Sequence, residues 1–114
     1  MVEEKKNLGE TSIGMQPNMA GLLSYLLGWI TGLIFYLVEK KNKFVRFHAM
    51  QSIVVFGGIA VLNIVLLVIP VLGVLLSLLL SLLGIVLWVL LMIKAYQGEF
   101  FKLPIAGDIA EKNS

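Results

Sequence analysis

Three long apolar stretches, separated by short polar or turn-forming segments, dominate the pattern of the chain. The first, about 19–38, contains twenty residues without a charge, which as a helix would be about 30 Å long, the thickness of a bilayer's hydrocarbon core. The second and third cover about 47–69 and 71–93. One helix over both would be far longer than the bilayer is thick, so we expect the chain to turn at Pro70. The pattern therefore predicts an all-α membrane protein with three transmembrane helices.

Composition supports lipid as the solvent of these helices. Hydrophobic residues make up 59% of the 114 residues and charged residues only 14%. A soluble domain of this size could not bury so much apolar surface, because small folds leave much of their surface in water. The net charge of +2 is small and its basic residues are scattered, which gives no indication of a nucleic-acid partner. The absence of cysteine excludes disulfides and thiolate chemistry.

The segments around the apolar stretches divide the chain into three predicted parts. Residues 1–18 mix charged residues with Gly, Ser, Thr and Pro and show no apolar period, which predicts a flexible N-terminal tail. Residues 19–104 form the predicted transmembrane domain. Residues 105–114 are predicted as a short interfacial helix and C-terminal tail. A signal peptide is the less favoured interpretation of the first stretch, because the apolar run is too long and no cleavage pattern follows it.

The distribution of basic residues predicts the orientation. With three spans, the N-terminal tail and the Pro70 turn share one face, which carries Lys5 and Lys6. The opposite face carries the remaining basic residues, which are Lys40, Lys41, Lys43, Arg46, Lys94, Lys102 and Lys112. The positive-inside rule then predicts a multi-pass protein of the plasma (inner) membrane, with the 39–46 loop and the C-terminus cytoplasmic and the N-terminus outside. Finding both ends on one side would overturn the three-span model, for example through a re-entrant first stretch.

A polar cluster stands at the mouth of the second predicted span. It consists of Arg46, His48, Gln51 and Ser52, and on an ideal helix Asn63 continues the same edge into the membrane. The favoured interpretation is that this edge forms hydrogen bonds to the serines of neighbouring helices. The alternative is a polar lining for a water-filled cavity between subunits. Arg46 is expected to reach toward lipid phosphate as an anchor.

Two further sets of residues carry predicted roles in the membrane. Lys40, Lys41 and Lys43, next to the polar cluster, predict contacts with anionic lipid headgroups. Small residues predict close helix packing, either inside one bundle or against another protomer. The residues singled out for packing are Gly28, Gly32, Ser77 and Ser81.

Catalytic chemistry finds little support in the sequence. The chain has one histidine, no cysteine and no acidic residue inside any predicted span. Neither a nucleophile–base pair nor a metal site can be assembled from these groups. We therefore expect a protein that is not an enzyme and that needs no cofactor.

Two motifs give a family resemblance. The string FVRFHAMQS at residues 44–52 resembles the signature of the Tic-twenty family, the membrane component of the plastid inner-envelope import translocon, and of its small uncharacterised bacterial and archaeal relatives. AYQGE at residues 95–99 is similar to the segment that ends those relatives. The resemblance implies an oligomeric or partner-bound membrane component with a channel or transport role. The alternative hypothesis is a non-conducting scaffold that binds anionic lipid or a protein partner.

Overall fold

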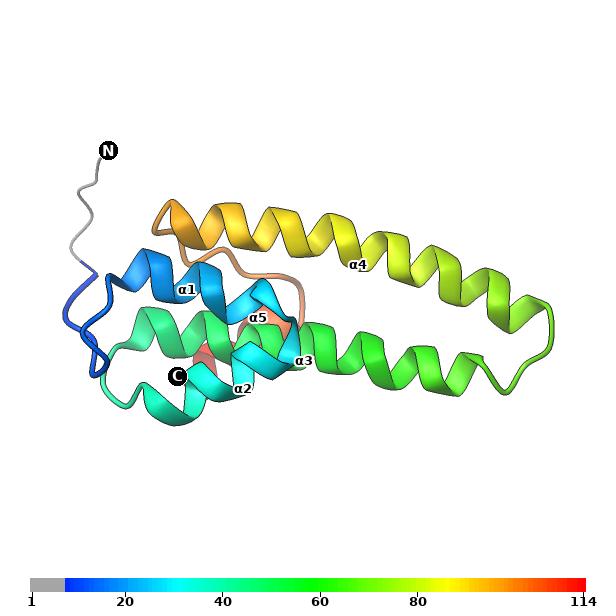
Figure 1. Ribbon diagram of the computed structural model, residues 1–114, viewed down its shortest axis with the longest axis horizontal. Helices are drawn as coiled ribbons and strands as arrows, with labels where there is room; N and C mark the ends of the chain where they lie inside the picture. The colour runs from blue at the N-terminus through cyan, green and yellow to red at the C-terminus, as the bar shows by residue number, and fades with distance from the viewer. Residues whose placement is uncertain (1–7) are drawn as a thin grey trace.

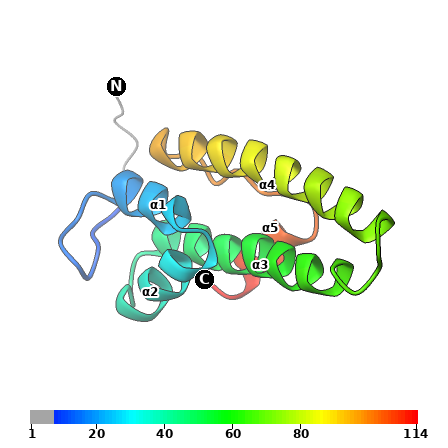
Figure 2. The same cartoon turned by 45° about the vertical axis from the view of Figure 1, so that its right-hand side comes forward.

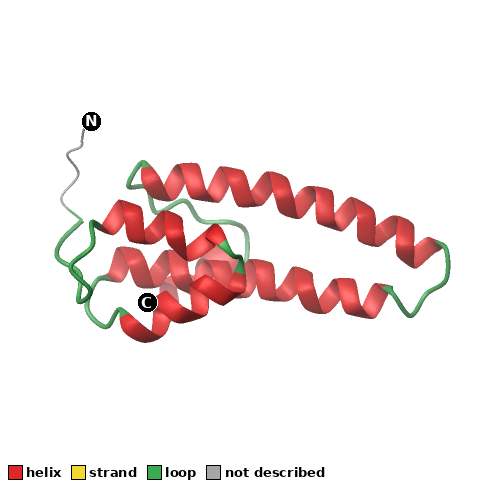
Figure 3. Cartoon of the chain, in the orientation of Figure 1, coloured by secondary structure: helices red, strands yellow, loops and turns green. Residues whose placement is uncertain are grey.

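The computed structural model describes residues 8–114, which form five helices and no strand (Figure 3). The helices are α1 (Pro17–Leu26), α2 (Trp29–Val38), α3 (Lys43–Leu66), α4 (Leu72–Tyr96) and α5 (Ala106–Lys112). The all-α fold class is confirmed. Two of these helices, α3 and α4, are long and apolar enough to cross a membrane.

The two long helices form an antiparallel hairpin that runs the length of the molecule (Figure 1). With 24 residues in α3 and 25 in α4, each is about 36 Å long at the helical rise. The chain reverses between them in the segment that contains Pro70, as the sequence predicts. Helix α3 starts at Lys43, four residues before the predicted span, because the side chain of Asn42 caps it by accepting a hydrogen bond from the N–H of Val45.

The first apolar stretch does not form the single span that was predicted over 19–38. It is divided at Leu27 and Gly28 into two ten-residue helices, α1 and α2, and α2 runs back alongside α1 (Figures 1 and 2). Gly28 has φ 65°, a left-handed conformation that glycine adopts without steric cost. Each helix is about 15 Å long, half the thickness of the hydrocarbon core. The stretch is therefore a hairpin of two short helices, each too short to span the hydrocarbon core by itself.

The contacts around this hairpin also differ from those that three spans would give. Three spans would separate the segment before α1 from the 39–46 loop by the full membrane. Instead, the N–H of Ser12 donates to the carboxylate of Glu39 at 2.8 and 2.9 Å, and Asn18, at the start of α1, donates to the carbonyl of Tyr96 at the end of α4. The start of the described chain, the 39–46 loop and the end of α4 thus lie at one end of the molecule, opposite the Pro70 turn.

The buried core is confined to that same end. All ten buried hydrophobic residues of the described chain lie outside residues 60–83. Tyr25, Leu91 and Ala95 form the central cluster, and α5 packs against α3 through its small buried residues Ala106 and Ala110. We call this end of the molecule, with α1, α2, α5 and the parts of α3 and α4 beside them, the wide end. Residues 60–83, where α3 and α4 continue alone, are the narrow end (Figure 1).

The residues predicted to pack helices have different surroundings. Gly28 forms the turn between α1 and α2 rather than part of a continuous helix. Gly32 lies against α3, where a Cβ would be 2.8 Å from the carbonyl oxygen of Ala49. Ser77 is half-buried between α4 and α3, whereas Ser81 is exposed.

Gly32→Ala should destabilise the fold, because the added methyl group would meet the backbone of α3 and the side chain of Ser52 at 2.9 Å. We expect a loss of about 1–3 kcal/mol, the range for overpacking a close contact, measured by thermal unfolding in mild detergent. Gly58→Ala is the matched control, since a Cβ there meets nothing within 4 Å and alanine favours the helix. Equal stability of the two variants would contradict the close approach of α2 and α3.

Candidate functional site

The candidate site is the set of polar side chains on the first turns of α3 and their partners elsewhere in the wide end. His48, Gln51 and Ser52 are fully buried. Within a membrane, non-helical backbone has no water to bond to, so its N–H and C=O groups need partners from the protein. The polar side chains of α3 bond to three such places, each described below.

The first place is the non-helical segment after α4. The Nε2 atom of His48 lies 2.7 Å from the carbonyl of Glu99, and because a carbonyl only accepts, this nitrogen carries the proton. Gln51 donates to the carbonyl of Phe101 at 2.9 Å and accepts from the N–H of Leu103 at 2.9 Å. These two side chains therefore satisfy three backbone groups of residues 99–103.

Tyr25 joins this segment to α1. Its hydroxyl lies 2.6 Å from Nδ1 of His48 and accepts from Nε2 of Gln51 at 3.0 Å. With the proton of His48 on Nε2, a neutral imidazole accepts at Nδ1 from the tyrosine hydroxyl, and every member of the network is satisfied. The rings of Phe44 and Phe47 enclose the imidazole, with centroids at 4.6 and 5.1 Å. The network is a closed internal structure.

The second place is the tip of the α1–α2 hairpin. Ser52 donates to the carbonyl of Gly28 at 2.8 Å. Thr31 accepts from the N–H of Leu27 at 3.1 Å, and the indole N–H of Trp88 donates to the carbonyl of Tyr25 at 2.8 Å. Side chains of α2, α3 and α4 thus satisfy the backbone that the turn releases, which allows the tip to lie in hydrocarbon.

The third place is the C-terminal end of α2, which Arg46 closes. Its guanidinium donates to the carbonyls of Tyr36 at 3.0 Å and Glu39 at 2.8 Å, and it lies 4.0 Å above the ring of Tyr36. Nε also donates to the carbonyl of Ser114 at 3.2 Å. The last carbonyls of a helix favour a cation. Arg46 was expected to anchor to lipid phosphate, but its contacts here are with the chain itself.

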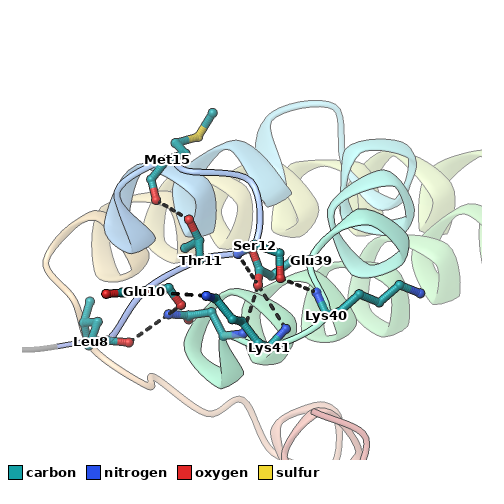
Figure 4. Close-up of polar contacts among 9 residues, drawn as sticks. Leu8, Glu10, Thr11, Ser12, Met15, Glu39, Lys40 and Lys41 are labelled. Carbon is teal, nitrogen blue, oxygen red and sulfur yellow. Dashed lines mark hydrogen bonds and ion pairs between the residues drawn. The ribbon is translucent and has the colours of Figure 1, made fainter.

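Glu39 and Asn42 tie the segment before α1 to the loop before α3 (Figure 4). The buried carboxylate of Glu39 accepts from the N–H groups of Ser12, Lys41 and Asn42. The side chain of Asn42 donates to the carbonyls of Leu8 and Glu10 at 2.9 and 3.1 Å. Burial raises the pKa of Glu39, but the hydrogen bonds from Ser12 and Asn42 outweigh it, so that the pKa lies below its ordinary value.

The remaining predicted site residues lie apart from this network. Asn63 is deep in α3 and accepts a hydrogen bond from Ser77 of α4, which joins the two long helices within the narrow end. Lys40, Lys41 and Lys43 are exposed, and Lys41 lies 3.6 Å from Glu10. The polar edge predicted from the sequence is therefore divided between two places.

Several residues that build the site carried no signal of their own in the sequence. Glu39 belongs to the predicted basic loop, and Tyr25 and Thr31 belong to the first apolar stretch. A tyrosine or threonine within a few residues of a glycine in the middle of an apolar run is the available clue, because such hydroxyls can satisfy a broken helix.

Together the fold and the network define a small helical membrane protein in which a hairpin of two short helices packs against two helices of membrane-spanning length. A family model described as the magnetosome magnetite crystal formation protein family matches residues 10–110, and the chain belongs to this family. No solved structure matches the chain significantly.

Curated relatives support the same assignment. The UPF0132 membrane protein MJ1443 of Methanocaldococcus jannaschii is 54% identical over 107 residues, covering 94% of this chain and 96% of that protein. A UPF0132 membrane protein of Archaeoglobus fulgidus is 53% identical over 98 residues, covering 86% and 95%. The chain is thus a small membrane protein of this family. The expected membership of the Tic-twenty family was wrong, because the matching family is a different one.

Tyr25→Phe should destabilise the wide end, because it removes the hydroxyl shared by His48 and Gln51 and leaves buried polar atoms without a partner. We expect a loss of about 1–3 kcal/mol, measured by thermal unfolding in detergent. Tyr96→Phe is the matched control, since Tyr96 is exposed. In a double-mutant cycle, Gln51→Leu should cost less in the Tyr25→Phe background than alone. Strict additivity would show that the two side chains do not interact.

Stability should fall in acid through Glu39. Because its folded pKa is below the ordinary value of 4.5, its contribution is fully present above pH 4.5 and is lost as the pH falls through the lower folded pKa. Glu39→Gln should cost about 1–2 kcal/mol at neutral pH and flatten this acid dependence, as measured by denaturation across a pH series. Parallel pH profiles for the two proteins would rule out Glu39 as the titrating group.

Proposed function

We propose that the protein is a two-pass component of the cell membrane with both termini in the cytoplasm, and that it acts as a non-conducting scaffold that binds anionic lipid headgroups. The observation that carries the proposal is that the polar side chains at the start of α3 form hydrogen bonds within the chain. The side chains that could have lined a pore, His48, Gln51 and Ser52, are fully buried and bonded within the chain. A water-filled path would need such groups to be free.

Charge supports this orientation. The basic residues of the described chain lie outside residues 47–93, a stretch without any charge that includes the Pro70 turn. In the hairpin arrangement they therefore gather at the wide end, and the positive-inside rule favours a cytoplasmic location for that end. Lys5 and Lys6, which were counted on the opposite face, lie outside the described residues.

Lipid contact is supported by the 40–43 loop. Lys40, Lys41 and Lys43 are exposed next to the first turn of α3, at the level where a spanning helix leaves the hydrocarbon. Each lysine near an anionic surface contributes about 1 kcal/mol of attraction. We also propose that the protein is not an enzyme, because the buried polar side chains His48, Gln51 and Ser52 are occupied by backbone partners.

A conducting role is the second candidate, and it has lost its main support. It depended on the resemblance to an import translocon, which the family assignment replaces. It would also require several copies or a protein partner, since the chain's own polar edge is enclosed. The description of the family concerns magnetite crystals. Within residues 8–114, no group of three or more His, Cys, Asp or Glu side chains that could hold a metal ion converges. We therefore base the proposal on the membrane architecture.

Topology gives the first test. Tags at residues 1 and 114 should both be inaccessible to protease added to intact cells and both accessible in inverted membrane vesicles. The physical reason is that the α1–α2 hairpin returns to the side from which it enters. If protease added to intact cells removed the tag at residue 1 but not the tag at residue 114, the chain would have three spans and the proposed arrangement would be excluded.

Conduction is tested directly in liposomes. Reconstituted protein should give no ion or solute flux above empty vesicles, and Arg46→Ala and His48→Ala should leave that baseline unchanged unless they unfold the protein. The protein should instead be more thermally stable in liposomes that contain anionic lipid than in liposomes without it. This difference should be smaller when Lys40, Lys41 and Lys43 are all replaced by Gln. Flux that depends on the protein would exclude the scaffold.

A further inference from the structure

The two ends of the molecule differ in the number of helices that cross any level. At the wide end α1, α2 and α5 pack around α3, and α4 packs against α1 and α3, whereas at the narrow end the two long helices continue alone (Figures 1 and 2). A helix with its side chains is about 10 Å across. The cross-section at the wide end is therefore roughly twice that of the narrow end or more. In the proposed topology α1 and α2 reach only to half depth, so the protein has a larger cross-section in one leaflet than in the other.

Lipid is the occupant that the surface of the narrow end fits. Its large apolar side chains are exposed, Val68 to 81%. A shallow groove of about 360 Å³ between α3 and α4 is lined entirely by leucines, namely Leu62, Leu66, Leu76, Leu79, Leu80 and Leu83. Acyl chains match such a surface, since they are as apolar as leucine.

A second copy of the chain fits the narrow end less well. Helices associate in lipid through small residues that allow close backbone approach. Gly73 is buried and Ser77 is bonded to Asn63, so both are used inside the α3–α4 hairpin. On the exposed faces of the two helices, Gly58 and Ser81 stand alone, with no exposed small residue four positions away. Nothing there forms the paired spacing that a helix contact uses.

We propose that the protein is a membrane wedge, which occupies more area in the cytoplasmic leaflet than in the outer leaflet and therefore binds preferentially to bilayer that is curved with its cytoplasmic leaflet convex. The partner is the lipid bilayer itself. Because only lipid surrounds the narrow end, no other protein compensates for the smaller area that it occupies in its leaflet. The packing stress from the unequal areas is lower where the leaflet that holds the wide end is expanded, as it is on the convex side of a curved bilayer. This inference rests on the proposed topology.

The test uses the full chain in vesicles of different size, in which each orientation serves as the control for the other. The chain has no cysteine, so single cysteines report orientation to a membrane-impermeant thiol reagent. Lys112→Cys marks the exposed end of α5 at the wide end, and Val68→Cys marks the exposed narrow end. As vesicles become smaller, labelling of Lys112→Cys should rise and labelling of Val68→Cys should fall, with a severalfold change in the ratio.

Several outcomes would overturn the wedge. A ratio that does not depend on vesicle size would show that the protein does not sense curvature. Efficient disulfide cross-linking between copies through Ser81→Cys, in large vesicles where the protein is dilute, would show that a second copy fills the narrow end. Failure of the topology itself is seen separately, as opposite labelling of a cysteine at residue 1 and of Lys112→Cys in large vesicles of uniform orientation.

Discussion

The structure depends on one constraint: backbone that leaves a helix inside a membrane must find its hydrogen-bond partners within the protein. This chain leaves the helix at the tip of the α1–α2 hairpin and again in residues 99–103. Both places are served from the same three turns of α3, by Ser52 for the first and by His48 and Gln51 for the second. A single polar segment thereby supports two departures from regular structure, which explains why so many polar residues stand together at the mouth of an apolar helix.

The same segment fixes how the wide end is assembled. Tyr25 bonds to His48 and Gln51, so α1 is held against α3 at the level where residues 99–103 also pack. Arg46 closes α2 and reaches the last residue of the chain. Loss of any one of these side chains would leave backbone groups without hydrogen-bond partners and would also create a cavity. The wide end should therefore unfold cooperatively. Its polar groups act as structural connections between the helices.

Sequence reasoning predicted the helical class, the turn at Pro70 and the positions of the two long helices, because these follow from hydropathy, length and proline chemistry. It failed at residues 19–38, where twenty apolar residues can cross a bilayer once or enter to half depth and return. Hydropathy is the same in both cases. What decides between them is the left-handed turn at Gly28 and its distant partners Ser52 and Trp88, which local patterns do not reveal. The polar residues of α3 could be found from the sequence, because polar residues stand out in an apolar stretch. Their partners could not, because these lie about fifty residues away in the chain.

The absence of charge around the Pro70 turn has a consequence for how the protein enters a membrane. From Phe47 to Ile93 the chain contains no Lys, Arg, Asp or Glu, so α3, the turn and α4 can be inserted together as a preformed hairpin without carrying an ionised group through the hydrocarbon. In the proposed topology, the α1–α2 hairpin needs no translocation beyond the midplane. If that topology holds, insertion of this protein requires partitioning of apolar helices into lipid and does not require a hydrophilic loop to cross it.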